Sequence, residues 1–288
     1  MTNNARIDEE TFPDAQRKWR ELCDRIRGLG RLAVAYSGGV DSTLLFHTAV
    51  ETLGRENALG LLVSSETLTP SEFEEARTLA VERGWPIEIL AYSELDIAGF
   101  RENAIDRCYT CKKELFGRLL ELARRRGFET LADGSSHEDL TDDYRPGMRA
   151  SRELGVVSPL LELGLRKDEI RALSHAAGLP NWNKPSAACL ASRFPYGTPI
   201  TREGLDQVAR GEALLRAKGF SQVRVRWHES VARIEVLADE IPRLLDPALR
   251  NEIVRTFKEI GFRYATLDLQ GYRTGSLNEG LWAAGSMQ

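Results

Sequence analysis

The amino-acid sequence predicts an α/β protein: a doubly wound, mostly parallel, Rossmann-like sheet followed by a smaller C-terminal α+β domain. Three observations predict this fold. Short apolar runs alternate with helical stretches over residues 1–180, which is the pattern of βαβ units. Residues 181–201 then carry three prolines and little periodicity. Beyond them, alternating strand patterns appear, so we expect domains at 1–180 and 181–288.

The first domain begins with a helix and continues as regular strand–helix pairs. The run at 31–36 is apolar and bounded by Gly30 and Ser37, which is typical of a buried strand. The elements expected in order are a helix at 14–28, the strand at 31–36, a helix at 42–53, a strand at 58–64, a helix at 71–83, a strand at 86–91, a helix at 112–126, a strand at 130–133 and a helix at 167–177.

The C-terminal domain is expected to be mixed. Residues 202–218 have helical spacing, and in 223–228 apolar residues alternate with basic ones as in a half-buried strand. A second strand is expected at 232–237. Apolar residues from 241 to 260 fit one helical face, and a last strand is expected near 264–269. We interpret the irregular segment 181–201 as a functional connection.

Composition excludes several classes of protein. The chain has 288 residues with 42% apolar and 28% charged side chains, as in ordinary globular proteins. Its 39 basic and 43 acidic residues give a net charge of −4, so there is no global positive field for nucleic acid. No stretch approaches the roughly 20 apolar residues that span a bilayer, and we expect a cytoplasmic location without a membrane partner.

The strongest motif is Ser37-Gly38-Gly39-Val40-Asp41-Ser42, between a buried strand and a helix start. Glycines allow a sharp turn, while hydroxyls, amides and a helix N-terminus favour an anion. Phosphate is therefore the expected ligand. The motif lacks the lysine of the G-x-x-x-x-G-K-[ST] loop and is not a dinucleotide G-x-G-x-x-G. The simpler interpretation is a glycine-rich turn in which Asp41 or Ser42 caps the helix.

Loops at the carboxyl ends of parallel strands converge on one ligand crevice. Ser64 and Gly134 follow two of the expected strands, so we place both at the same site. Four carboxylates and Arg145 follow Gly134. They favour either an acidic solvated loop or a site near Mg²⁺, with Arg145 near phosphate or substrate; the carboxylates are Glu138, Asp139, Asp142 and Asp143.

Cysteine spacing is more informative than cysteine number. Cys23 lies in an amphipathic stretch and is expected to pack in the core. Cys108 and Cys111 form a C-x-x-C directly before the helix expected from Lys112, and Cys189 lies in the irregular segment. Four cysteines are too few for a disulfide scaffold, so reactive or metal-binding thiols are expected. Zinc would usually take a fourth ligand, for which His137 is the one weak candidate.

Two resemblances follow from these motifs. The Ser-Gly-Gly-x-Asp-Ser loop resembles the pyrophosphate loop of the N-type ATP pyrophosphatases, the PP-loop superfamily. Over nearly the whole chain the sequence resembles the LarE family, and it has the pattern of three-cysteine members. The runs that carry this second resemblance are Asp-Arg-Cys108-Tyr-Thr-Cys111-Lys-Lys-Glu-Leu-Phe, Asp143-Tyr-Arg-Pro-Gly, Lys184-Pro-Ser-Ala-Ala-Cys189-Leu-Ala-Ser-Arg and Leu267-Asp-Leu-Gln-Gly-Tyr-Arg.

The resemblance implies an ATP-dependent sulfur transferase. Its expected substrate is pyridinium-3,5-biscarboxylic acid mononucleotide, whose carboxylates become thiocarboxylates for the nickel-pincer nucleotide cofactor. It implies that Cys189 delivers sulfur, either as a sacrificed thiol or on a [4Fe-4S] cluster with Cys108 and Cys111. It also implies a homo-oligomer that uses ATP and Mg²⁺. ATP would be bound by Ser37, Gly38, Gly39, Asp41, Ser42, Ser64 and Gly134, and Mg²⁺ by Asp41, Glu138 and Asp139.

The substrate is an anion, so we expect arginines to bind it. Arg193 lies beside Cys189, and Arg145, Arg224 and Arg226 complete the predicted set, with His228 and Arg233 as weaker candidates. A solvent-exposed, charged sheet face is the simpler interpretation of the last four.

Other functions are compatible with the same loop. A cluster-dependent tRNA thiolase would require a basic surface, which the net charge does not favour. An amidotransferase would have no use for the C-x-x-C. A non-catalytic nucleotide or iron sensor would bind ATP without releasing pyrophosphate.

Overall fold

The computed structural model describes residues 14–140, 146–186 and 188–278. The chain divides into two compact units: residues 1–93 with 106–186, and residues 94–105 with 187–288. We call them unit 1 and unit 2. The separation of residues 1–180 and 181–288 into domains stays a prediction of the sequence.

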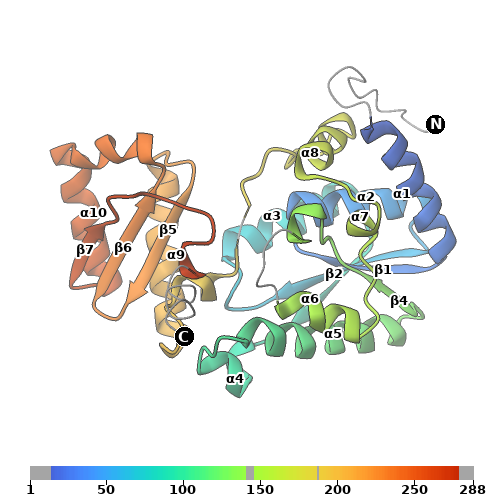
Figure 1. Ribbon diagram of the computed structural model, residues 1–288, viewed down its shortest axis with the longest axis horizontal. Helices are drawn as coiled ribbons and strands as arrows, with labels where there is room; N and C mark the ends of the chain where they lie inside the picture. The colour runs from blue at the N-terminus through green and yellow to red at the C-terminus, as the bar shows by residue number, and fades with distance from the viewer. Residues whose placement is uncertain (1–13, 141–145, 187, 279–288) are drawn as a thin grey trace, which may run out of the picture. The chain divides into compact units, whose positions relative to one another are not determined.

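Unit 1 is built on a four-stranded parallel sheet in the order β3-β2-β1-β4 (Figure 1). The predicted class, a doubly wound parallel α/β fold, is confirmed. The strands are β1 (Leu32–Tyr36), β2 (Ala58–Ser64), β3 (Ile87–Ala91) and β4 (Thr130–Ala132); the helices are α1 (Ala15–Leu29), α2 (Val40–Leu53), α3 (Pro70–Glu82), α5 (Arg107–Arg125), α6 (Pro146–Glu153), α7 (Pro159–Glu162) and α8 (Lys167–Ala176).

Two apolar cores cover the two faces of this sheet. Because side chains alternate along a strand, Leu32, Val34 and Tyr36 of β1 pack into one core with α1, α2, α3, α7 and α8. Ala33 of the same strand belongs to the other core, with Leu119 of α5. In Figure 1, α5 and α6 lie on the side of the sheet opposite to α1 and α2.

Unit 2 contains a three-stranded sheet in the order β5-β6-β7, in which β5 and β6 are antiparallel and β6 and β7 parallel. Residues 94–105 join this unit because the backbone carbonyls of Arg101 and Asn103 accept hydrogen bonds from Ile200 and Gly197. Its elements are α4 (Ala98–Arg101), α9 (Arg202–Ala217), β5 (Val223–His228), β6 (Val231–Val236), α10 (Pro247–Ile260) and β7 (Tyr264–Leu267), with 3₁₀ segments at Leu190–Arg193 and Ala238–Leu245.

Two expected elements differ from the structure. The helix predicted from Lys112 begins five residues earlier, at Arg107, because neither Pro nor Gly interrupts the preceding residues; Cys108 and Cys111 are therefore part of α5. The single helical face expected over 241–260 is divided into a 3₁₀ segment and α10. Pro247 is the first residue of α10, where proline suits a helix start but ends the preceding element.

None of the helices in the described part of the chain is long and apolar enough to cross a membrane.

Candidate active site

The loop between β1 and α2 is held closed by its two serine hydroxyls. Ser42 Oγ accepts from the amide of Ser37 at 3.2 Å, donates to the carbonyl of Gly39 at 3.2 Å and lies 3.0 Å from Ser37 Oγ. The loop ends on the first turn of α2, whose amides have no partners within the helix. This geometry is a site for an anion at a helix N-terminus, as the sequence predicts.

Two glycines bring neighbouring segments against this loop. Gly38 has φ +71°, and a Cβ there would lie 2.4 Å from the Cβ of Ala76 in α3. A Cβ on Gly134 would lie 2.8 Å from the amide nitrogen of Ser42. The segment after β4 therefore lies directly on the N-terminus of α2. The structure thus brings Gly134 together with the predicted phosphate loop.

Ser64 lies at the same edge of the sheet. In the parallel register Tyr36 pairs with Leu62 of β2, and Val34 pairs with Ala132 of β4. Ser64 therefore follows β2 at the carboxyl edge from which the phosphate loop starts. This is the edge at which open parallel sheets bind ligands.

Asp41 and Lys167 form an ion pair beside the loop. Lys167 Nζ lies 2.5 Å from Asp41 Oδ2, while Asp41 Oδ1 is buried with no hydrogen-bond partner among the described residues. Burial raises the pKa of Asp41; the Lys167 charge and hydrogen bond oppose this rise, and the Asp139 charge adds to it. A buried carboxylate oxygen without a donor fits a role as a ligand of Mg²⁺.

Asp41→Asn is expected to separate stability from activity. Because the pKa of Asp41 is raised in the folded protein, its ionisation makes the folded state less stable as pH rises through that value. The amide removes this cost, so the variant should melt at or above the wild-type temperature at neutral pH. ATP-dependent pyrophosphate release should fall about 100-fold, because a cation ligand is lost. Thermal melting and pyrophosphate release measure the two effects; an active variant would exclude Asp41 from the site.

Glu138 and Asp139 take part in local hydrogen bonds. Asp139 accepts from the amide of Ser136 at 2.8 Å, and Glu138 accepts from the amide of Lys167 at 2.9 Å. Within the described residues, no three His, Cys, Asp or Glu side chains are arranged as a metal site. Asp142, Asp143 and Arg145 lie outside the described residues.

Asn181 ties the segment after α8 to the phosphate loop. Its side-chain amide donates to the carbonyl of Gly38 at 3.1 Å and to Thr43 Oγ1 at 2.9 Å. A pocket of about 640 Å³ opens next to it, between α3 and this segment; it is lined by residues that include Gly38, Glu74, Glu75 and Lys184. Asn181 and Lys167 are the residues of this site that sequence reasoning missed.

The signals for these two residues were weak. Lys167 stands at a predicted helix start and Asn181 follows a proline, and both features have ordinary structural explanations. Their proximity to the loop depends on the packing of α8 against α2, which no motif encodes.

The C-x-x-C lies on the first two turns of α5. Cys108 is exposed and Cys111 half-buried, three residues apart and therefore on the same side of the helix. Tyr109 between them donates to Glu153 of α6 at 2.6 Å, and the guanidinium of Arg149 lies 4.1 Å from the centre of its ring. Helix α6 thus fixes the start of α5.

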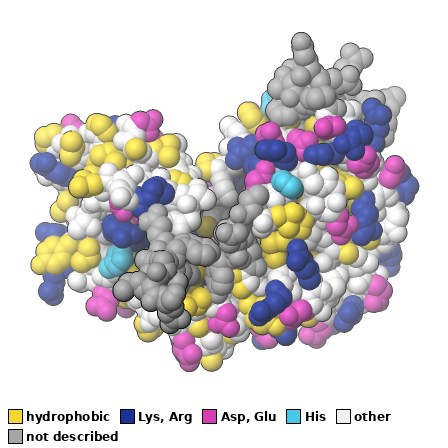
Figure 2. Space-filling model, in the orientation of Figure 1, with side chains coloured by type: hydrophobic (Ala, Val, Ile, Leu, Met, Phe, Trp, Pro, Cys, Tyr) yellow, Lys and Arg dark blue, Asp and Glu magenta, His cyan; other side chains and the backbone are white. Residues whose placement is uncertain are grey.

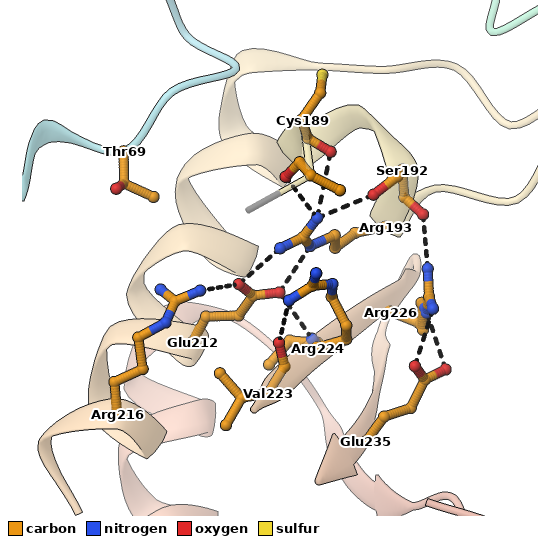
Figure 3. Close-up of polar contacts among 12 residues, drawn as sticks. Thr69, Cys189, Ser192, Arg193, Glu212, Arg216, Val223, Arg224, Arg226 and Glu235 are labelled. Carbon is orange, nitrogen blue, oxygen red and sulfur yellow. Dashed lines mark hydrogen bonds and ion pairs between the residues drawn. The ribbon is translucent and has the colours of Figure 1, made fainter. Parts of the chain in front are cut away.

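Cys189 is exposed and starts the 3₁₀ segment of unit 2. Figure 3 shows its sulfur pointing away from the arginines, whereas its carbonyl points toward Arg193. Arg193 Nη1 donates to the carbonyls of Ala188 and Cys189 at 2.8 and 3.2 Å, and to Ser192 Oγ at 2.9 Å. The predicted sulfur donor is therefore part of a turn built around one guanidinium.

Arginines and carboxylates form a cluster on the sheet of unit 2 and beside it (Figure 3). Arg226 makes a bidentate pair with Glu235 at 2.8 and 2.9 Å and donates to the carbonyl of Ser192 at 2.8 Å. Arg224 lies 5.1 Å from the ring centre of Tyr272; burial, then the charge of Arg193, lowers its pKa to about 10. Arg224 therefore stays protonated at neutral pH.

Positive charge exceeds negative charge in this cluster. Three carboxylates, Glu212, Glu235 and Asp268, pair with five arginines, which are Arg193, Arg216, Arg226, Arg233 and Arg273; Arg224 adds a sixth positive charge. An excess of buried or half-buried guanidinium groups favours a carboxylate or phosphate ligand. The structure thus brings Arg193, Arg224 and Arg226 into one unit with Cys189.

Comparison with known proteins agrees with this geometry. Residues 25–126 match the NAD synthase family model. The chain is 44% identical to an uncharacterized protein of Synechocystis sp. over 87% of this chain and 92% of that protein. It is 39% identical to pyridinium-3,5-bisthiocarboxylic acid mononucleotide synthase of Lactiplantibacillus plantarum, over 91% of this chain and 94% of that protein. It is 38% identical to an NH(3)-dependent NAD(+) synthetase of Methanosarcina acetivorans over 56% of this chain and 65% of that protein.

A parallel sheet with a serine–glycine phosphate loop at its carboxyl edge defines the class of PP-loop ATP pyrophosphatases. Similarity over nearly the full length of both chains is narrower evidence. The chain belongs to the LarE family, and it is an ATP-dependent sulfurtransferase.

Proposed function

We propose that this enzyme uses ATP to activate a carboxylate of pyridinium-3,5-biscarboxylic acid mononucleotide and replaces a carboxylate oxygen with sulfur. The product would be the thiocarboxylate of the nickel-pincer nucleotide pathway. The observation that carries the proposal is the 39% identity to the named synthase, which extends over 94% of that protein and includes Cys189.

The first step would be adenylation. A carboxylate oxygen attacks the α-phosphorus of ATP, the bond to the β-phosphate breaks, and pyrophosphate leaves with the electron pair. The loop from Ser37 to Ser42 would hold the leaving pyrophosphate through its amides and hydroxyls, which are fixed before ATP arrives. Mg²⁺, held by Asp41, would neutralise phosphate charge. Ser64 and Gly134 would complete the ATP site.

Lys167 would contact the phosphates during this step. Its ammonium lies next to the loop on a carboxylate that is proposed to bind Mg²⁺. Lys167→Met should therefore raise the KM for ATP about 10-fold or more and lower the rate of pyrophosphate release. It should also move the acidic limb of activity to higher pH, since the lysine charge that lowers the pKa of Asp41 is gone. A pH profile of pyrophosphate release tests both effects; an unchanged profile contradicts them.

The second step would replace AMP by sulfur. A sulfur nucleophile attacks the acyl carbon of the adenylate, the C–O bond to AMP breaks, and AMP leaves with the electron pair. The arginines of unit 2 would hold the anionic substrate, with Arg224 and Arg226 nearest to the predicted role. Cys189, exposed at the start of its turn, would present the sulfur.

The donor set fits an iron–sulfur cluster by its chemistry. Cys108 and Cys111 share one side of α5 and Cys189 is exposed, so three thiolates, the usual ligands of iron–sulfur clusters, are available. Cys108, Cys111 and Cys189 would hold a [4Fe-4S] cluster, which supplies an open iron position for an exchangeable sulfide. The three cysteines would keep the cluster in place and orient it toward the acyl group.

Iron and acid-labile sulfide content tests this arrangement. We expect about four of each per chain in anaerobically purified wild type, and loss of both in Cys108→Ala, Cys111→Ala and Cys189→Ala. Cys23→Ala is the matched control and should keep the cluster, because Cys23 lies half-buried in α1. Absence of iron after reconstitution would leave Cys189 as a sacrificial donor that becomes dehydroalanine.

The tRNA thiolase remains the second candidate, although no structural observation favours it. On the face that Figure 2 shows, basic and acidic side chains are interspersed. Thiolation of the mononucleotide, but not of tRNA, is the expected outcome of a direct comparison of the two substrates. A homo-oligomer and a cytoplasmic location stay predictions of the sequence.

A further inference from the structure

The turn that carries Cys189 is anchored to a buried arginine. Arg193 is 2% exposed, and its Nη1 bonds two consecutive carbonyls, those of Ala188 and Cys189. A second guanidinium, that of Arg226, bonds the carbonyl of Ser192 in the same turn. The backbone on both sides of the Cys189 sulfur is therefore fixed from the protein interior.

Arg193 is itself held by Glu212 of α9. The two side chains form a bidentate pair at 2.7 and 2.9 Å, and Glu212 is completely buried. Glu212 also accepts from the amide of Val225 in β5 at 3.1 Å and from Arg216 at 2.7 Å. The guanidinium plane is thus fixed by a helix and a strand on one edge while its other edge holds the turn.

This pair is an expensive way to stabilise a fold. Burying two charges costs desolvation energy, and well-packed apolar residues often serve as well or better. A planar guanidinium with fixed donors offers something that apolar residues do not, because it determines the direction of several hydrogen bonds at once. The geometry is therefore better explained by precise placement of the turn than by stability alone.

We propose that Arg193 and Glu212 form a positioning pair that orients Cys189 for sulfur transfer, so that Arg193 acts through the cysteine turn and not by binding substrate. The inference rests on the proposed function in one respect, that Cys189 carries the sulfur. It replaces the role in substrate binding that the sequence predicts for Arg193.

Two conservative variants test the proposal. Arg193→Lys keeps the charge but not the planar fork, and Glu212→Gln keeps the shape but not the charge. Glu169→Gln is the matched control: Glu169 is also a buried glutamate in an ion pair, with Lys18 at 2.7 Å, but it lies in unit 1. Two quantities are measured in each folded variant: amide hydrogen exchange of peptides covering residues 188–194, and kcat and KM for thiocarboxylate formation.

We expect both test variants to exchange about 10-fold faster in this segment, where the amide of Ser192 bonds the carbonyl of Cys189 at 2.9 Å. Their kcat should fall about 10- to 100-fold while KM stays within about twofold, since misplacement of the nucleophile affects the reacting geometry and not ground-state binding. Glu169→Gln should melt at a lower temperature without changing either quantity.

Three results would overturn the proposal: wild-type exchange in folded Arg193→Lys and Glu212→Gln, faster exchange with wild-type kcat, or a rise in KM alone, which indicates substrate binding. If wild-type enzyme forms no thiocarboxylate, the proposed function fails, while the exchange measurement still decides whether Arg193 anchors the turn.

Discussion

Replacing Cys189 with alanine should abolish sulfur transfer and leave adenylation intact. The two steps use different residues: the phosphate loop in unit 1 binds the leaving pyrophosphate, and the cysteine in unit 2 presents sulfur. We expect thiocarboxylate formation to fall by at least about 10³-fold, as for loss of a nucleophile. ATP–pyrophosphate exchange dependent on the mononucleotide should stay within about twofold of wild type.

The variant is structurally mild, which makes the result interpretable. Cys189 is exposed, and its printed contact with Arg193 is through the backbone carbonyl, which alanine retains. Cys23→Ala controls for general loss of a thiol: it should reduce thermal stability slightly and leave both assays unchanged. A Cys189→Ala enzyme that still forms thiocarboxylate would show that free sulfide attacks the adenylate directly.

The fold was predictable because its signals are local. Strand β2 has the predicted bounds, Ala58–Ser64, and β1, α2 and α8 lie within two residues of theirs, since short apolar runs and helical periodicity need no long-range information. The start of α5 was missed because the C-x-x-C was interpreted as a loop, although its residues permit a helix. The break before α10 was missed because apolar periodicity outweighed the signal of Pro247.

The site was predictable where a motif encodes it and not where packing creates it. The serine–glycine loop, Gly134 and Cys189 are recognisable from the sequence. The pairing of Asp41 with Lys167, 126 residues away, and of Arg193 with Glu212 depends on how helices pack. Arg193 illustrates the difference: an arginine beside a reactive cysteine suggests a substrate ligand, but the fold turns its guanidinium inward.

Gly38→Ala should be the most damaging substitution in unit 1. The new Cβ would lie 2.4 Å from the Cβ and 3.1 Å from the Cα of Ala76, and alanine is strained at φ +71°. Helix α3 resists moving away, because Tyr36 of β1 donates to the carbonyl of Ala76 at 3.0 Å. Left-handed backbone costs about 1–2 kcal/mol and overpacking about 1–3 kcal/mol, so we expect a loss near 2–4 kcal/mol of unfolding free energy.

The same substitution should lower kcat/KM for ATP by about 100-fold, because the loop must shift away from α3 and its amides then miss the phosphates. Gly28→Ala, at an interior position of α1 with open space around its Cβ, is the control and should be neutral or stabilising. Adding Ala76→Gly to Gly38→Ala separates the two causes. The double variant removes the clash but keeps the backbone strain, so ATP use should recover in part. Failure of any recovery would assign the whole effect to the left-handed backbone, and wild-type ATP use in Gly38→Ala alone would exclude this loop as the phosphate site.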